Sequence, residues 1–275
     1  MAAKACSILI TGANRGLGLE MVKQMVESPW PVRQLLACCR ELDGLRAEGL
    51  QDLAKKHPNV ITVIRLDATD PCSIKESAKQ VGSLVGKAGL NLLVNNTGML
   101  THGTMQTTST QKMQAAFNTN IMGPMDVTKE FLPYLQAAAT ASGKPGMSCS
   151  KPAVFSISSM VGSMATIKEM YSFFPMASAN LPPFSLPAPP FLSSQAGLNM
   201  LTLCATEEFR KDEILFVVLH PGWVRIDMDG EGGAIDAPES VEGLLCMMDS
   251  LLRNRLGPSW TMRAKSCLGK LTGLY

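Results

Sequence analysis

The chain has 275 residues, of which 46% are hydrophobic and 17% are charged, a composition that suits one sizeable buried core and excludes an intrinsically disordered protein. Its formal net charge is +2, and no run of basic residues is longer than Lys55-Lys56. This balance provides little electrostatic attraction to nucleic acid or to an acidic membrane, so we expect neither as a partner.

The cysteines and the N-terminal residues indicate which further classes of protein we do not expect. The eight cysteines are scattered, and no Cys-x-x-Cys pair or Cys/His cluster offers tetrahedral ligands, so we predict no metal site. The apolar stretch from Ser7 to Ile10 is too short for a secretory signal, and no segment approaches the roughly 20 apolar residues of a membrane span. We therefore expect a cytoplasmic protein with reduced thiols, including the adjacent Cys38 and Cys39.

Short apolar runs alternate with helix-like segments along the chain. The runs are rich in Val, Ile and Leu without strict alternation, which is typical of strands covered on both faces. The predicted strands are Ser7–Thr11, Gln34–Cys39, Val60–Leu66, Leu90–Val94, Ala153–Ile157 and Ile214–Leu219. The predicted helices between them include Leu19–Val26, Cys72–Val85, Met113–Leu135 and Gly197–Phe209. This order predicts an α/β fold: a single doubly wound Rossmann-type domain over residues 1–275, with a mostly parallel sheet and helices on both faces.

Two regions do not follow this order. Residues 168–195 contain six prolines and no helical or strand period, so we interpret them as a mobile proline-rich insertion. The tail over residues 253–275 is atypical because it has no clear periodicity either.

A glycine-rich turn over residues 11–18 lies between the first predicted strand and the first predicted helix. Glycines at these spacings let the backbone turn tightly and approach a pyrophosphate, which then lies on the amides of the helix N-terminus. An ordinary glycine-rich turn is the alternative, but the position directly after a strand favours a nucleotide site. The predicted cofactor-binding residues here are Gly12, Asn14, Arg15, Gly16, Leu17 and Gly18.

The end of the second predicted strand indicates which dinucleotide binds. A site that selects NAD places a carboxylate there for the ribose 2′-hydroxyl, whereas here Cys39 is followed by Arg40. Arg40 and Arg15 together could hold a 2′-phosphate through bidentate hydrogen bonds, although either arginine alone could be a solvated surface residue. We therefore predict NADP(H) as the cofactor.

The spacing Thr-Gly-x-x-x-Gly-x-Gly resembles that of the short-chain dehydrogenase/reductase family, and further motifs follow in the family's order. Over about residues 5–250 the sequence is most similar to the small carbonyl reductases of the sniffer and C-factor type. Asp67, which follows the third predicted strand, could by itself be a helix cap. The resemblance implies that the further cofactor-binding residues are Asp67, Ala68, Asn95, Thr97 (in place of the family's alanine), Gly98, Pro221, Gly222 and Val224.

The resemblance also implies an active site. Asn120 falls where the family's asparagine kinks a long helix, although alone it could be a satisfied core amide, and Ser159 takes the place of the substrate-orienting serine. In the family, a Tyr-x-x-x-Lys motif moves the proton, because the lysine lowers the tyrosine's pKa from about 10. Counting back from Ala-Gly-Leu-Asn at residues 196–199 places Phe191 at the tyrosine and Gln195 at the lysine. Phenylalanine has no proton to give, and glutamine carries no charge.

Tyr171 is the alternative proton donor, because it lies 12 residues after Ser159, as the family's tyrosine does. The residue four positions later is Pro175, which carries no charge and would break the required helix. We therefore interpret Tyr171 as a surface or packing residue.

The genetic code allows a further hypothesis about residues 181–195 and the tail. All of residues 181–194 except Ala188 can be encoded with pyrimidines at the first two codon positions, and Gln195 can be CAG, as in a translated polypyrimidine tract and splice acceptor. A genuine proline-rich loop is the alternative. A shifted frame over Pro258 to Gly269 can read Phe-Leu-Asp-Tyr-Glu-Gly-Lys-Val-Leu-Pro-Trp, which resembles the usual ending of this branch of the family. Retained intron sequence and a frameshifted tail are thus hypotheses about the transcript.

The resemblance implies an NADPH-dependent carbonyl reductase that passes hydride to a small-molecule ketone or aldehyde. The missing tyrosine and lysine predict that this activity is impaired, as in a pseudoenzyme that still binds NADPH through its N-terminal part. Two alternatives stay open: a non-catalytic nucleotide-binding protein, and an aberrant isoform without an enzymatic role. The resemblance also implies a homodimer if the two long helices pack as they do in the family.

Overall fold

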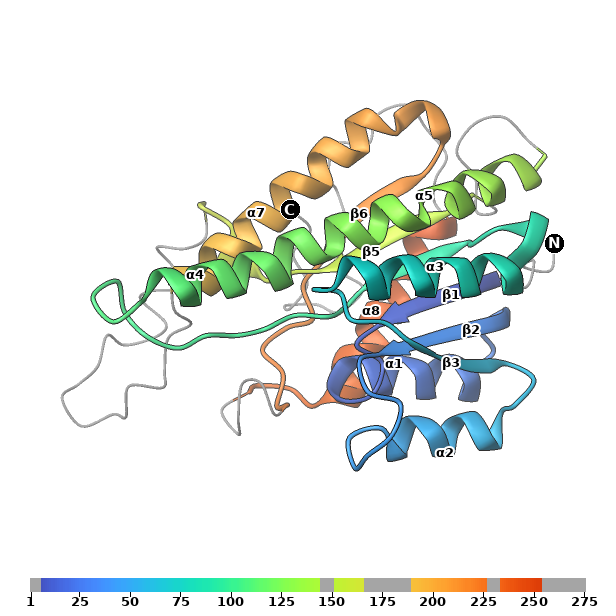
Figure 1. Cartoon of the computed structure of the whole chain (residues 1–275), viewed down its shortest axis with the longest axis horizontal. Coiled ribbons are helices and arrows are strands. Elements are labelled where there is room, and N and C mark those ends of the chain that lie inside the picture. The colour runs from blue at the N-terminus through green and yellow to red at the C-terminus, as the bar shows by residue number, and fades with distance from the viewer. Residues whose placement is uncertain (1–5, 144–150, 166–188, 227–232, 254–275) are drawn as a thin grey trace.

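The computed structural model of the chain describes residues 6–143, 151–165, 189–226 and 233–253. Its centre is a six-stranded sheet in the order β3-β2-β1-β4-β5-β6 (Figure 1). All five pairings between neighbouring strands are parallel. The order reverses between β1 and β4, which defines a doubly wound sheet. The predicted α/β fold is confirmed.

The strands lie close to their predicted positions, each beginning and ending within two residues of the apolar run that predicts it. They are β1 (Cys6–Thr11), β2 (Val32–Cys39), β3 (Ile61–Arg65), β4 (Leu92–Asn95), β5 (Ala153–Ile157) and β6 (Leu215–Leu219). Because they are parallel, their carboxyl ends all meet at one edge of the sheet, which we call the carboxyl edge.

Helices cover both faces of the sheet (Figure 1). The helices on one face are α1 (Gly16–Glu27), α2 (Glu48–Lys56) and α8 (Ala237–Arg253), and those on the other face are α3 (Pro71–Val85), α4 (Thr110–Phe117), α5 (Gly123–Ala141) and α7 (Pro189–Glu208). The apolar core accordingly has two layers. Along β1, Ile8 and Ile10 pack in the layer beneath α1 and α8, and Leu9 packs in the opposite layer with Phe131 of α5.

A π-helical turn over Asn118–Met122 separates α4 from α5. The sequence predicts one helix over Met113–Leu135, and the structure interrupts it at this turn. Asn120, at the centre of the turn, is 2% exposed. The helix is thus interrupted at Asn120 by one turn with wider hydrogen-bond spacing.

The start of α7 corrects the prediction for the proline-rich insertion. The sequence analysis finds no helical period over residues 168–195, but residues 189–195 form the first turns of α7. Pro189 and Pro190 fit there because the first turn of a helix needs no N–H partner and a proline φ is already near the helical value. Residues 168–188, including Tyr171, lie outside the described residues, as do residues 254–275, while Arg253 is the last residue of α8.

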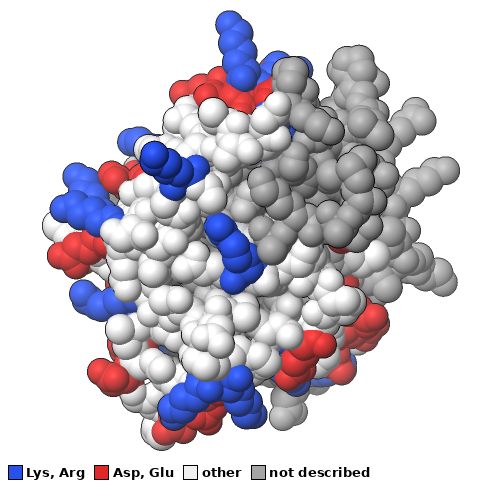
Figure 2. Space-filling model, turned by 90° about the vertical axis from the view of Figure 1, so that its right-hand side faces the viewer, with Lys and Arg blue, Asp and Glu red and all other residues white. Residues whose placement is uncertain are grey.

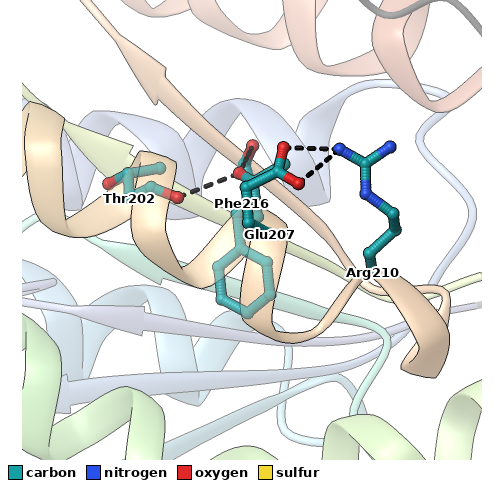
Figure 3. Close-up of polar contacts among 5 residues, drawn as sticks. Thr202, Glu207, Arg210 and Phe216 are labelled. Carbon is teal, nitrogen blue, oxygen red and sulfur yellow. Dashed lines mark hydrogen bonds and ion pairs between the residues drawn. The ribbon is translucent and has the colours of Figure 1, made fainter.

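The carboxyl end of α7 is joined to β6 (Figure 3). Thr206 Oγ1 donates to the Thr202 carbonyl at 2.9 Å and lies 3.5 Å from the Phe216 carbonyl of β6. The nearby Arg210 guanidinium hydrogen-bonds Glu207 and lowers the pKa of that carboxyl. Because this ion pair is exposed to solvent, it contributes little to stability, and the contacts with β6 hold this end of the helix.

Charged residues of both signs are interspersed on the face shown in Figure 2, which is the edge where the strands begin. A cavity of about 420 Å³ lies near this edge and is lined in part by Lys151 and Glu213, which form an ion pair. Lys151 Nζ also donates to the Ala139 carbonyl in the last turn of α5 at 3.0 Å, where a cation stabilises the helix end. Within the described residues, no helix combines the length and the apolar character needed to cross a membrane.

We expect Gly89→Ala to destabilise the fold more than Gly143→Ala. Both glycines have a left-handed φ, of +71° and +70°, which costs any L-residue about 1–2 kcal/mol. A Cβ on Gly89 would also lie 2.4 Å from the Tyr134 carbonyl oxygen and the Ala138 nitrogen in α5, whereas nothing lies within 4 Å of one on Gly143. Urea unfolding should show a loss above about 3 kcal/mol for Gly89→Ala. Equal losses in the two variants would contradict this packing.

Candidate functional site

The predicted site residues converge on the carboxyl edge. Ligands of doubly wound proteins bind outside the carboxyl ends of the strands, where the strand order reverses. Here that point lies between β1, which leads into the glycine turn, and β4, which ends at Asn95. The segments after β5 and β6, beginning at Ser158 and His220, extend the same edge.

The glycine turn has the geometry expected of a backbone cradle. Gly12 and Gly16 adopt left-handed φ angles of +66° and +52°, and nothing lies within 4 Å of a Cβ placed on Gly16. A Cβ on Gly18 would lie 2.1 Å from the Gly12 carbonyl oxygen, so only glycine lets α1 pack this closely on the turn. Leu17 is buried beneath it, and Asn14 Nδ2 donates to the Arg46 carbonyl at 3.3 Å.

A polar lock joins β1 to β4 at the reversal point. Thr11 Oγ1 accepts the N–H groups of Asn96 and Thr97, both at 3.0 Å. The Asn96 carboxamide donates to the Thr11 carbonyl at 2.9 Å and to the Gly12 carbonyl at 3.2 Å. Thr97 and Gly98 are thereby held beside the glycine turn. The sequence analysis did not assign Asn96 to the site, although its place between the predicted residues Asn95 and Thr97 was an available signal.

The predicted residues for the adenosine end lie after β1, β2 and β3. Arg15 and Arg40 are exposed, and the preceding Cys39 is buried. Cys39 Sγ lies 3.1 Å from the Glu41 carbonyl and orders the turn that carries Arg40. Burial raises the pKa of the Cys39 thiol, which therefore stays protonated near neutral pH.

Asp67 orders its own turn after β3. Its Oδ1 accepts the Thr69 N–H at 2.8 Å and the Thr69 hydroxyl at 2.7 Å. The neighbouring Ala68 is buried, and its carbonyl oxygen would lie 2.8 Å from a Cβ on Gly123. The turn is thus fixed against the start of α5, which places the Asp67 backbone at the carboxyl edge.

Asn120 joins three segments of the site. Its Oδ1 accepts the Met99 N–H at 2.8 Å, and its Nδ2 donates to the Met99 carbonyl and to Ser194 Oγ, both at 2.9 Å. Ser194 is fully buried in α7. The carboxamide therefore ties the segment after β4 and the π-helical turn to α7. The sequence analysis did not find Ser194, because no local pattern marks a contact between residues 74 positions apart.

The segment after β5 packs directly on α7. Ser158 Oγ donates to Asn199 Oδ1 at 2.6 Å, and the half-buried Ser159 accepts the Val161 N–H at 3.4 Å. A Cβ on Gly162 would lie 2.7 Å from the Gln195 carbonyl carbon. The short 3₁₀ turn that follows Ser159 therefore touches α7 at Gln195.

Phe191 and Gln195 lie on consecutive turns of α7, four residues apart, so they share one face of the helix. Phe191 is half-buried, whereas Gln195 is 4% exposed. Gln195 Oε1 is buried and has no hydrogen-bond partner. Neither side chain carries a charge or an acidic proton.

A hydrogen bond from α8 holds the turn after β6 in place. Ser240 Oγ donates to the Pro221 carbonyl at 2.6 Å, and Gly222 has a left-handed φ of +87°. Val224 is 1% exposed and forms a parallel bridge with Ile235. These contacts fix the backbone that closes the site on the β6 side.

His220, which precedes this turn, is a buried imidazole. It is 8% exposed, and desolvation by burial lowers its pKa to about 4. Its Nδ1 has no hydrogen-bond partner. Among the described residues, no group of three or more His, Cys, Asp or Glu side chains could hold a metal ion.

Comparisons with known proteins agree with this architecture. A family model described as short chain dehydrogenase matches residues 7–172. An uncharacterized oxidoreductase of Schizosaccharomyces pombe is 30% identical over 218 residues, which are 79% of this chain and 73% of that protein.

Two solved structures are also similar over most of their length. The NADPH-bound carbonyl reductase from chicken fatty liver has a TM-score of 0.80 and 37% identity, covering 90% of this chain and 88% of that one. The carbonyl reductase Sniffer of D. melanogaster has a TM-score of 0.77 and 29% identity, covering 90% of this chain and 92% of that one. The expected similarity to sniffer-type carbonyl reductases is confirmed.

We expect the stability of the protein to fall in acid because of His220. The folded-state pKa of about 4 lies below the ordinary value of 6.5, so the unfolded chain takes up a proton that the folded protein resists. Stability that is present above pH 6.5 is therefore lost as the pH falls towards 4, by about 3 kcal/mol at most.

Urea unfolding at pH 7.5 and pH 4.5 measures this loss. His220→Gln should reduce the difference in stability between the two pH values. The same pH dependence in His220→Gln and in the unmodified protein would refute the prediction.

Proposed function

The chain belongs to the short chain dehydrogenase family, and from this premise we propose that it is an NADP(H)-binding oxidoreductase of the carbonyl reductase type whose catalytic step is impaired. The observation that carries the proposal is the pair Phe191 and Gln195 on the face of α7 that meets the segment after Ser159. The cofactor half of the site has the features that NADP(H) binding requires. The proton-transfer half lacks the acidic hydroxyl and the adjacent ammonium that proton transfer requires.

The cofactor half is supported by the residues around the glycine turn. The open space at Gly16 and the amides of the first turn of α1 suit a pyrophosphate. Arg15 and Arg40 would bind a 2′-phosphate, and Asp67 and Ala68 would border the adenine. The related chicken carbonyl reductase was solved with NADPH bound. When bound, NADPH supplies the hydride for a carbonyl group.

The nicotinamide half is supported by the polar lock and the turn after β6. Thr97 and Gly98 are held beside the glycine turn, and Pro221 and Gly222 close the opposite side. Val224 and Asn95 would complete the contacts with this half of the cofactor. A small-molecule carbonyl compound is the substrate class that this site would take.

The impairment is argued from proton delivery. Reduction of a carbonyl needs a proton donor at the oxygen as well as a hydride at the carbon. Ser159 can orient a carbonyl oxygen, but the three hydrogen bonds of the Asn120 carboxamide are directed to Met99 and Ser194. Four residues after Tyr134 and Tyr171 the sequence has Ala138 and Pro175, where the family's motif has a lysine. Tyr134 lies in α5 against Phe131.

Two further candidates remain from the sequence analysis. A non-catalytic nucleotide-binding protein, acting alone or as one partner of a homodimer, would keep the cofactor half without turnover. An aberrant isoform would carry residues 181–195 as translated intron sequence and a frameshifted tail. Sequencing of the transcript across codons 165–200 distinguishes these two candidates.

We predict that Arg40→Gln weakens NADPH binding about 10- to 100-fold, because charge-assisted hydrogen bonds to the 2′-phosphate are lost. NADH affinity should be unchanged, since NADH lacks that phosphate. Arg33→Gln is the matched control, because Arg33 is also exposed but lies at the start of β2, on the opposite edge of the sheet. Calorimetric titration that shows equal losses for both cofactors would count against a 2′-phosphate site.

We predict that the double variant Phe191→Tyr/Gln195→Lys gains carbonyl reduction that the unmodified chain lacks. The two positions already share a face of α7, so a phenol and an adjacent ammonium would meet there without any change of chain length. The measurement is NADPH oxidation with a panel of ketones and aldehydes. Each single variant is a control and should stay inactive. Steady turnover by the unmodified protein would overturn the proposed impairment.

A further inference from the structure

The cavity of about 420 Å³ lies away from the carboxyl edge, at the edge where the strands begin. Its volume is within the range of pockets that hold small molecules. The last turns of α5 line one side, and the turn that leads from α7 into β6 lines the other (Figure 1). None of the described residues that line this cavity belongs to the proposed NADP(H) site.

A buried ion pair forms part of the lining. The side chain of Lys151, which lies just before β5, is 4% exposed, and that of its partner Glu213 is 26% exposed. Lys151 Nζ also donates to the Ala139 carbonyl at the end of α5. The charge of this ammonium is thus balanced by a carboxylate and by the negative end of a helix. Burying such a pair returns little net stability, because both charges lose their hydration.

The backbone of Glu213 is strained. Its φ is +57°, and among the described residues it is the one non-glycine residue with a positive φ. A left-handed conformation costs about 1–2 kcal/mol in an L-residue. Strained residues cluster at ligand sites, where the surrounding structure holds them in place. Here the strain turns the chain from the 3₁₀ turn over Arg210–Asp212 into β6 and keeps the Glu213 carboxylate at Lys151.

Two further charged side chains line the cavity without a counter-charge. Asp212 is half-buried, and its Oδ1 accepts the Gln136 carboxamide at 2.8 Å. Lys211 is exposed. Within the part of the chain that the structure describes, neither of them forms an ion pair. The lining therefore offers a ligand one carboxylate and one ammonium, and the negative end of α5 lies beside them.

These charges select a class of ligand. An anion would meet Lys211 but would be repelled by Asp212 and by the end of α5, and a cation would leave Lys211 without a partner. A small zwitterion matches both charges at once. The Thr140 hydroxyl and the Gln136 carboxamide add neutral groups that can form hydrogen bonds with a polar side chain of the ligand.

We propose that this cavity binds a small zwitterion of the α-amino acid class. The ligand's ammonium lies at Asp212 and its carboxylate lies at Lys211, while the Lys151–Glu213 pair fixes the two walls relative to each other. The site is on the opposite edge of the sheet from the glycine turn, so it does not depend on the proposed function.

The first measurement compares three probes by calorimetric titration of the full chain. L-Glutamine carries both charges, N-acetyl-L-glutamine lacks the ammonium, and the C-terminal amide of L-glutamine lacks the carboxylate. L-Glutamine should bind in the millimolar range, and each analogue should bind about fivefold more weakly, as expected for the loss of one partly exposed ionic contact.

The second measurement assigns each charge to its partner. Asp212→Asn keeps an oxygen for the Gln136 carboxamide and removes the charge, so it should weaken L-glutamine about fivefold and leave N-acetyl-L-glutamine unchanged. Lys211→Gln should likewise weaken L-glutamine and leave the amide analogue unchanged. Lys87→Gln is the matched control, because Lys87 is exposed at the same edge of the sheet but does not line the cavity. Melting temperatures check that each variant is folded.

The outcomes separate this inference from the proposed function. The zwitterion site is wrong if L-glutamine does not bind the unmodified protein, or if N-acetyl-L-glutamine binds as tightly as L-glutamine does. It is also wrong if Lys87→Gln weakens L-glutamine as much as Asp212→Asn and Lys211→Gln do. NADPH affinity should be the same in all three variants and in the unmodified protein. Absence of NADPH binding by the unmodified protein would refute the proposed function and leave the amino acid titrations to decide this site.

Discussion

The arrangement of the site depends on the hydrogen bonds of one buried carboxamide, that of Asn120. It lies in the π-helical turn between α4 and α5 and joins Met99, in the segment after β4, to Ser194 in α7. Because Ser194 is fully buried, its bond with Asn120 fixes how far α7 extends over the carboxyl edge and how it is rotated. The positions of Phe191 and Gln195 follow from that rotation, and with them the chemistry that the edge can perform.

The two halves of the proposed cofactor site depend on different parts of the fold. The glycine turn, Arg40 and Asp67 follow β1, β2 and β3, and the lock formed by Thr11 and Asn96 holds the reversal point without α7. The proton-transfer half of the site depends on α7, which carries Phe191 and Gln195. A sequence change at the start of α7 would therefore alter proton transfer, while the glycine turn would keep its geometry. The proposal of binding without efficient reduction rests on this division.

The carboxyl edge also shows how polar atoms are distributed between folding and function. In the interior of the sheet, strands β1 to β6 are covered by apolar side chains on both faces. At the edge, some polar groups satisfy each other, such as Ser158 with Asn199, while Gln195 and His220 keep unpaired atoms. Each buried polar atom without a partner lowers stability, which is one reason why sites are commonly less stable than the cores that carry them.

The amino-acid sequence by itself determined the strands, their order along the chain and the glycine turn. Fully buried parallel strands require continuous apolar runs, and a tight turn requires glycine. It did not determine the start of α7: the prolines at 189 and 190 resemble helix breakers, but they form the first turn of a helix that Ser194 joins to Asn120 and Gln195 packs against Gly162. The unpaired state of Gln195 Oε1 and the depressed pKa of His220 were likewise decided by tertiary packing. Burial and pairing are properties of residues distant in the chain, and local periodicity carries no information about them.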